Sequence, residues 1–248
     1  MTFWEHLEEL RGCLIRIVVA LLVCAIVFFC LKEPLFYVVM APKYDSFVTY
    51  RWCERLVGPL PSFRVDLVNI ELAQQFIIHL KMALWAAFFV LVPYIIFLLF
   101  RFVSPALYRS ERRHTLRAVV AGYLLFITGV LLGYFVIFPL TFRFLGTYQV
   151  SPEVTNVISL SSYISVFLML LLVMGIVFEL PVLCWLLGRM GLLGADFMRR
   201  YRRHAIVIIV ALAAVITPTG DIFTLSVVSL PIYLLYELSI LLVKRIKA

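Results

Sequence analysis

The chain has 248 residues, of which 64% are hydrophobic and 15% are charged, and its mean hydropathy is +1.07. A soluble domain of this size cannot bury so large an apolar fraction, so the composition excludes an ordinary soluble protein and predicts one that is embedded in a bilayer. The formal net charge is +8. In a membrane protein, the positions of these cations between the apolar stretches predict the orientation.

Six apolar stretches are candidates for transmembrane helices, since about 20 apolar residues cross the hydrocarbon core. They cover residues 12–31 (interrupted by Arg16), 82–100, 118–142, 154–178 with a continuation past Glu179, 205–220, and 222–243 (interrupted by Glu237). The last two are separated only by Asp221, and sixteen residues of helix reach only about 24 Å. We therefore predict an all-α integral membrane protein, a single polytopic domain over residues 1–248, with six transmembrane helices of which helices five and six are short.

The positions of lysine and arginine predict the orientation of these helices. An even number of spans places both termini on one side, and that side collects fifteen of the 22 lysines and arginines. Because cytoplasmic loops are rich in these residues, we predict that both termini are cytoplasmic. Residues 1–11 are then a cytoplasmic amphipathic segment, 101–117 and 188–204 are cytoplasmic loops, and 32–75 form a long periplasmic loop with room for one or two short helices.

One acid in the first segment has no evident partner. The pattern of residues 1–11 predicts an amphipathic helix, on which Glu8 can pair with Arg11 three positions later. Glu9 has no cation three or four positions away. Two interpretations stay open: Glu9 is a solvated acid that complements the helix dipole, or it is a binding carboxylate.

A second isolated acid lies in the loop between the second and third spans. Glu111 is the one acid among five arginines in residues 101–117. It either offsets the neighbouring arginines or, together with Glu9, offers an acidic site to a basic ligand. Because the planar guanidinium binds carboxylates in a bidentate manner, two such acids favour arginine over lysine in a short peptide.

The third acid, Glu179, lies inside an apolar stretch. It follows 25 uncharged residues, 154–178, and precedes Leu180, Pro181 and seven more uncharged residues. A carboxylate at membrane depth costs several kcal/mol unless it is protonated, paired or hydrated, so it indicates a functional cavity. Pro181 cannot donate to the carbonyl of Val177, which predicts a bend and a polar notch beside Glu179. An acid that is hydrogen-bonded within its own bundle is the alternative.

The motifs of common catalytic sites are absent from the sequence. It has no nucleophile elbow, no zinc-protease helix, no phosphate-binding glycine loop and no Cys-x-x-Cys. The four histidines flank the apolar stretches, and the five cysteines are scattered without the spacing of metal ligands. We therefore predict a protein that is not an enzyme, holds no cofactor or metal and binds no nucleic acid.

Five short motifs, spread in order along the chain, carry a family resemblance. They are His6-Leu-Glu-Glu-Leu-Arg11, Ser104-Pro-Ala-Leu-Tyr-Arg-Ser-Glu-Arg-Arg113, Phe178-Glu-Leu-Pro181, Ile216-Thr-Pro218 leading to Asp221, and Pro231 through Tyr236-Glu237. Together they resemble the TatC family, the core receptor subunit of the twin-arginine protein translocase. The motifs cover essentially the whole chain, and their combination is specific although each one alone is weak.

The resemblance implies a fold and a function. It implies a concave, glove-like bundle of six helices in the bacterial cytoplasmic (inner) membrane, which binds the twin-arginine signal peptides of folded export substrates and works in a translocase driven by the proton motive force. Partners would be single-span subunits of the TatA and TatB type in an oligomer surrounded by membrane lipid, without a cofactor. The signal-peptide site would comprise Glu9, Arg11, Phe102 and Glu111; a polar site in the membrane, where partner helices bind, would comprise Glu179, Pro181, Thr217, Asp221 and Glu237.

The sequence also departs from the family pattern at four places. The last hairpin reads Thr217-Pro-Thr-Gly-Asp221 where many members have Thr-Pro-Pro-Asp, and Leu98 and Leu225 stand where a glutamine is familiar. Gln74 replaces a common glutamate seven residues before Lys81, so a neutral amide stands where an ion pair is expected.

Three other functions are consistent with an apolar chain that contains buried acids. A proton-coupled secondary transporter would use Glu179 and Glu237 as a relay, but it predicts a repeat symmetry that the sequence lacks. An intramembrane enzyme lacks a nucleophile and a base here. A structural scaffold for other membrane subunits is the third, and a preference for Arg-Arg over Lys-Lys peptides would separate a receptor from all three.

Overall fold

The structure is a computed structural model that describes residues 3–58, 65–103, 112–149, 151, 156–217 and 221–246. The chain divides into two compact units. Unit 1 comprises Met1–Met40 and Asn69–Leu124, and unit 2 comprises Ala41–Val68 and Leu125–Ala248. The boundary falls inside helix α5 (Arg112–Leu132). The single domain over residues 1–248 stays a prediction.

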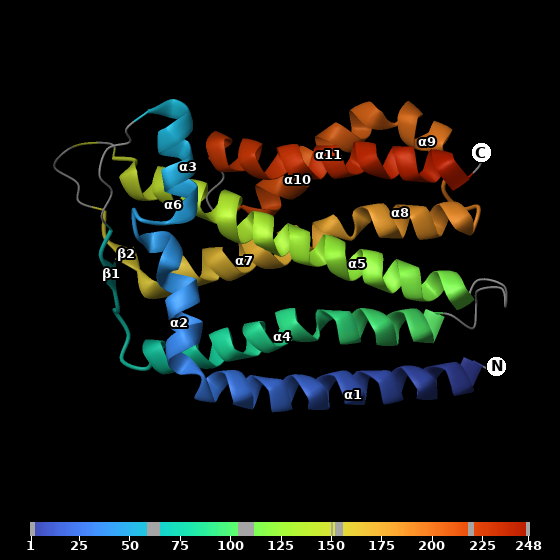
Figure 1. The fold of residues 1–248 in the computed structure, drawn as a ribbon, viewed down its shortest axis with the longest axis horizontal. Coiled ribbons are helices and arrows are strands. Elements are labelled where there is room, and N and C mark those ends of the chain that lie inside the picture. Colours follow the sequence, from blue (N-terminus) through green and yellow to red (C-terminus); the bar gives the residue numbers. More distant parts are fainter. Residues whose placement is uncertain are drawn as a thin grey trace. The chain divides into compact units, whose positions relative to one another are not determined.

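Unit 1 consists of two long helices, one short helix and the first part of α5. Its elements are α1 (Phe3–Cys30), α2 (Lys32–Met40), α4 (Gln74–Val103) and the first part of α5. The predicted amphipathic segment and the first span are one continuous helix. α1 packs along α4 in antiparallel orientation (Figure 1), because Phe29 near the end of α1 contacts Phe76 and His79 near the start of α4. The Phe29 and His79 rings stack at 4.2 Å.

Unit 2 holds the remaining elements. They are the 3-10 turn η1 (Ala41–Lys43), α3 (Val48–Val57), β1 (Leu67–Val68), the π-helical turn η4 (Gly133–Ile137), α6 (Phe138–Thr147), β2 (Ile158–Ser159), α7 (Leu160–Phe178), α8 (Leu180–Arg189), α9 (Ala195–Arg200), α10 (Arg202–Ile216) and α11 (Ile222–Ile246). The strands β1 and β2 form a parallel pair in which Leu67 faces Ile158. The long loop does contain short helices, α2 and α3, as its length predicted; the strand pair was not predicted.

An aromatic cluster holds α6 against α7. Phe138, Phe142, Tyr163 and Phe167 make edge-to-face contacts with ring centroids 4.9–5.1 Å apart, a geometry that adds to the energy of their burial. Tyr50 of α3 joins this region, since its hydroxyl lies 2.9 Å from the carbonyl of Pro42 and 3.1 Å from that of Pro139. The phenol is almost fully buried.

Glycines allow α5 and α7 to cross closely. A Cβ added at Gly129 would lie 2.4 Å from the carbonyl oxygen of Met174, and one at Gly175 would lie 2.5 Å from the Phe126 ring. Gly129 and Gly133 have the spacing of the small-residue motif by which membrane helices approach each other. The spacing of these glycines is a sequence signal of the close crossing between α5 and α7 near Met174 and Gly175.

Five helical stretches in the described part of the chain are long and apolar enough to cross a membrane. They are Leu7–Cys30, Gln74–Leu99, Val119–Thr147, Leu160–Arg189 and Ile222–Ile246. The all-α, multi-pass class is therefore confirmed. The predicted fifth span corresponds to α10, which is short as predicted, at fifteen residues, and the count of six spans stays a prediction.

The prediction that helix six is short is wrong. α11 has 25 residues, which corresponds to about 37 Å. The prediction failed because the length of sixteen residues, which describes the fifth run, was applied to both helices, although the run of residues 222–243 is itself 22 residues long. In the structure the helix continues through Glu237, whose carboxylate is paired with Arg202.

Candidate functional site

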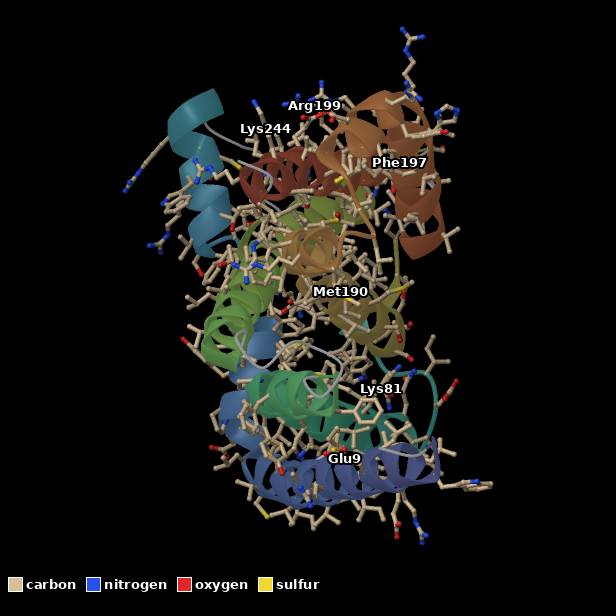
Figure 2. The ribbon with its side chains drawn as sticks, turned by 90° about the vertical axis from the view of Figure 1, so that its right-hand side faces the viewer. Glu9, Lys81, Met190, Phe197, Arg199 and Lys244 are labelled. Atoms are coloured by element: carbon tan, nitrogen blue, oxygen red, sulfur yellow. The ribbon has the colours of Figure 1, made fainter. Side chains whose placement is uncertain are left out.

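Glu9 lies on the face of α1 that packs on α4. Figure 2 shows it between the ribbons of these two helices, and Cys13, one turn later on the same face, is buried. Oε2 of Glu9 is buried and has no hydrogen-bond partner among the described residues. The neighbouring Glu8 is exposed. A buried carboxylate oxygen without a donor is costly, so Glu9 can gain much from a donor supplied by a ligand.

Phe102 lies at the same end of unit 1 as Glu9. Glu9 precedes Phe29 by 20 residues, about 30 Å of helix, and Phe102 follows His79 by 23 residues, about 35 Å. Because Phe29 stacks on His79 and the helices are antiparallel, these distances place Glu9 and Phe102 at similar depth. Phe102 is half-buried, and Arg11 is exposed. Glu111 lies outside the described residues, so its predicted pairing with Glu9 stays a prediction.

Glu179 occupies the break between α7 and α8. Its N–H donates to the carbonyl of Ile176 at 3.0 Å, and its carbonyl accepts from Leu183 at 3.0 Å. α8 begins at Leu180 with the buried Pro181 in its first turn, where proline's missing N–H costs no helical bond. The helix is interrupted at Glu179, within one turn of Pro181, and the predicted bend and polar notch stay predictions. Oε1 of Glu179 is buried without a hydrogen-bond partner in the described part of the chain.

A large apolar groove lies beside this break in unit 2. Its volume is about 1360 Å³. The walls come from the end of α5, η4, α6 and α11, with Phe178 contributed by α7. Glu179 itself is not among the lining residues, but it follows Phe178 directly. A groove of this size with apolar walls has room for lipid chains or the side chains of a helix from another subunit.

The side chains of Thr217 and Asp221 form hydrogen bonds at the end of α10 and at the start of α11. Thr217 is buried, and its hydroxyl donates to the carbonyl of Ala213 at 2.9 Å, which closes the last turn of α10. Asp221 Oδ1 accepts from the N–H of Thr224 at 2.7 Å, the bond of a helix N-cap. Asp221 also lines the groove. It is therefore both a cap and the acid at the groove's edge.

Both carboxylate oxygens of Glu237 have partners within unit 2. Its Oε2 lies 2.6 Å from Nη2 of Arg202 at the start of α10, and its Oε1 accepts from the hydroxyl of Tyr233 at 3.1 Å. Sixteen residues of helix, about 24 Å, separate it from Asp221. The predicted membrane residues thus do not form one site: Glu237 joins α10 to α11, whereas Asp221 lies at the groove.

At two of the positions where the sequence departs from the family pattern, the structure shows what the residue that is present does. The Gln74 side chain is buried at the start of α4, and its Oε1 accepts from the N–H of Ile70 at 3.2 Å. A neutral amide thus closes the turn before α4. Leu98 is buried within unit 1, so an apolar residue completes the packing there.

Comparison with known proteins decides the family. The family model "Sec-independent protein translocase protein (TatC)" matches residues 5–231. The chain belongs to the TatC family. TatC of Blattabacterium sp. subsp. Periplaneta americana (strain BPLAN) is 35% identical over 250 residues, covering 97% of this chain and 94% of that protein. TatC of Aquifex aeolicus (strain VF5) is 31% identical and covers 98% and 95%.

Solved structures agree with the sequence match. A crystal structure of the twin-arginine translocase receptor TatC is 30% identical and superposes with a TM-score of 0.80, covering 98% of this chain and all of that one. TatC proteins are components of a protein translocase, a transport family rather than a family of enzymes. This TatC-family chain is accordingly a multi-pass membrane protein of the Tat system.

Two features of the site were missed by reasoning from the sequence. The Arg202–Glu237 pair joins residues 35 positions apart, and nothing in the local pattern indicates it; only Tyr233, one turn before Glu237, was a signal of a satisfied acid. The groove is built from residues of three separate segments, so periodicity could not predict it.

Proposed function

We propose that this TatC-family chain is the subunit that binds twin-arginine signal peptides and forms the core of a translocase for folded proteins. The observation that carries the proposal is Glu9, a carboxylate with a buried oxygen that lacks a partner among the described residues, on the α1 face that packs on α4. The related structure of the twin-arginine translocase receptor supports the same role.

Recognition rests on two acids and one aromatic ring. One signal arginine binds Glu9 through the planar fork of its guanidinium, and the second binds Glu111. Phe102, at the depth of Glu9, packs on the apolar part of the signal, and Arg11 balances the charge at the exposed surface of α1. Lysine carries the same charge but cannot bind bidentately, so the site selects arginine pairs.

Unit 2 is the part of the chain that binds partner subunits within the membrane. Single-span partners of the TatA and TatB type bind near Asp221 and Thr217 and place apolar side chains in the groove. Glu179 and the bend at Pro181 give such a helix one polar contact, since a carboxylic acid can donate to a polar partner in a dry environment. One chain does not enclose a path for a folded domain, so the working translocase is an oligomer.

We also propose a topology for the chain. Six spans, with α10 as the short fifth, place both termini on the cytoplasmic side of the bacterial inner membrane, and the proton motive force drives transport. The cations in the last turns of α8 and α11 and in residues 199–203 support this orientation. The alternative, a proton-coupled carrier that uses Glu179 and Glu237, is disfavoured because both oxygens of Glu237 have partners in the structure.

Photo-crosslinking tests the proposal. A photoreactive amino acid replaces Phe102 in membranes that contain the partner subunits, and the probe is a signal peptide with Arg-Arg or with Lys-Lys. We expect crosslinks to the Arg-Arg peptide that fall at least tenfold with Lys-Lys or with Glu9→Gln. Glu8→Gln is the matched control, since Glu8 is the exposed neighbour. Equal crosslinking in all four cases would refute the site.

A further inference from the structure

A π-helical turn and a proline interrupt the stretch Val119–Thr147, one of those that can cross a membrane. In η4 the N–H of Phe138 donates to the carbonyl of Gly133, five residues earlier rather than four. Pro139 comes next and has no N–H, so the carbonyl of Phe135, four residues before it, loses its usual helical donor. A backbone carbonyl at membrane depth is costly without a donor. The break therefore needs a donor from elsewhere in the fold.

Helix α3, which lies in the loop of residues 32–75, supplies donors on both sides of this break. The hydroxyl of Thr49 donates to the carbonyl of Phe135, 86 positions away. The hydroxyl of Tyr50 lies 3.1 Å from the carbonyl oxygen of Pro139. Phe47, just before α3, stacks its ring on that of Phe135 with the centroids 5.8 Å apart. All three residues are buried, and α3 runs across the line of η4 and α6 (Figure 1).

The same π-helical turn also forms part of the wall of the apolar groove. Val136 and Ile137 of η4 line the groove, and α6 continues this wall. Phe144 of α6 stacks on Phe223 of α11 with the ring centroids 4.6 Å apart, so the two walls meet at that point. One extra residue in a turn rotates the side chains before it by about 100° relative to those after it. The shape of the groove therefore depends on whether η4 keeps its π-helical form.

We propose that Thr49 and Tyr50 are positioning residues for partner binding. By binding the two carbonyls beside Pro139, they hold η4 and α6 in the form that opens the groove to a helix of a partner subunit. This inference rests on the proposed function of the groove, and it gives the loop of residues 32–75 control over that function. Neither residue is among those that line the groove, so both act on the partner only through η4 and α6.

Three variants of the full chain and two measurements test this inference. Thr49→Val keeps the shape of the side chain and removes the donor, whereas Thr49→Ser keeps the donor. The matched control is Thr147→Val, since the Thr147 hydroxyl donates at 2.7 Å to a carbonyl of its own helix, α6. Hydrogen exchange of the purified chain reports on residues 133–145. In membranes with single-span TatA- and TatB-type subunits, a photoreactive amino acid at Leu234, which lines the groove, reports on partner binding.

We expect Thr49→Val to speed exchange in residues 133–145 about fivefold, the effect of losing one hydrogen bond on local opening. Crosslinks from Leu234 to the partners should fall about two- to fivefold, because a partner then binds only the molecules in which the groove is formed. Thr49→Ser and Thr147→Val should stay within about twofold of the wild type in both measurements. Crosslinks from Phe102 to the Arg-Arg peptide should not change, since Phe102 belongs to unit 1.

Unchanged exchange in Thr49→Val would overturn the inference, and so would faster exchange with unchanged crosslinks from Leu234. Equal losses at Leu234 and Phe102 would also overturn it, because they would indicate general unfolding. If the wild type itself gives no crosslink from Leu234, the proposed partner site fails, whereas the exchange measurement still decides whether α3 holds η4. Should Thr49→Val not purify as a helical protein, Tyr50→Phe takes its place with the same expected changes.

Discussion

Glu9 in the first turns of α1 and Glu237 in the second half of α11 are both acids in long apolar helices, but they differ in what surrounds them. Glu237 has Arg202 at 2.6 Å and Tyr233 at 3.1 Å. Glu9 has a buried oxygen with no hydrogen-bond partner among the described residues. An acid whose cation is built into the fold is structural, whereas an acid without such a cation is suited to a ligand.

The largest expected effect separates the two acids by function. Glu9→Gln should lower export of a folded twin-arginine reporter more than tenfold, because the amide cannot form the charge-assisted bonds with a guanidinium. Glu237→Gln should lower it less than threefold. Cell fractionation with the two variants at matched expression checks this, and a greater loss from Glu237→Gln would break the comparison.

A third acid, Glu179, is expected to affect the stability of the fold. Glu179 resembles Glu9, since its Oε1 is buried without a partner in the described part of the chain. Glu179→Met should raise the free energy of unfolding by about 1–2 kcal/mol, because a buried polar group without a donor is removed. Export should fall in the same variant. Thermal unfolding in detergent measures the first effect, with Val177→Met as the apolar control; a lower melting temperature for Glu179→Met would show that the fold does satisfy this acid.

Tyr50 is a neutral buried group whose hydroxyl, unlike Oε2 of Glu9 among the described residues, has partners within the fold. Tyr50→Phe should lower stability by about 1 kcal/mol, since the carbonyls of Pro42 and Pro139 lose their donor. Tyr44→Phe, at an exposed tyrosine, should change nothing. Burial raises the pKa of the Tyr50 phenol, so its contribution is complete below pH 10 and is lost as the pH rises above the ordinary tyrosine value. Denaturation at pH 8 and pH 11 measures both effects, and an equal cost at the two values would contradict the account.

The smallest effect concerns the Arg202–Glu237 pair itself. Both side chains are partly exposed, at 45% and 27%, so their coupling energy should be only about 0.5–1 kcal/mol. A double-mutant cycle with Arg202→Gln and Glu237→Gln isolates this energy, and it should decrease in high salt. A coupling near zero would leave Glu237 free for another partner and weaken the comparison.

Reasoning from the sequence predicted what composition and local pattern determine. The membrane class, the break at Glu179 and the short α10 follow from apolar runs, Pro181 and the turn before Asp221. The length of α11 was wrong because the sixteen residues of the preceding run were taken for both helices, although the apolar run of residues 222–243 is longer. The Arg202–Glu237 pair was missed because residues 35 positions apart leave no periodic signal. Glu9 was found because no cation lies three or four positions away on its own helix; its burial against α4 required the structure.

The ratio of the dissociation constants for Arg-Arg and Lys-Lys signal peptides is the most direct test of the central claim, that Glu9 is the carboxylate that selects arginine. It would be measured on the purified chain for the wild type, Glu9→Gln and Glu8→Gln. We predict a preference of at least tenfold for Arg-Arg in the wild type and in Glu8→Gln, and a several-fold smaller preference in Glu9→Gln, where only Glu111 still selects arginine. An unchanged preference in Glu9→Gln would contradict the account.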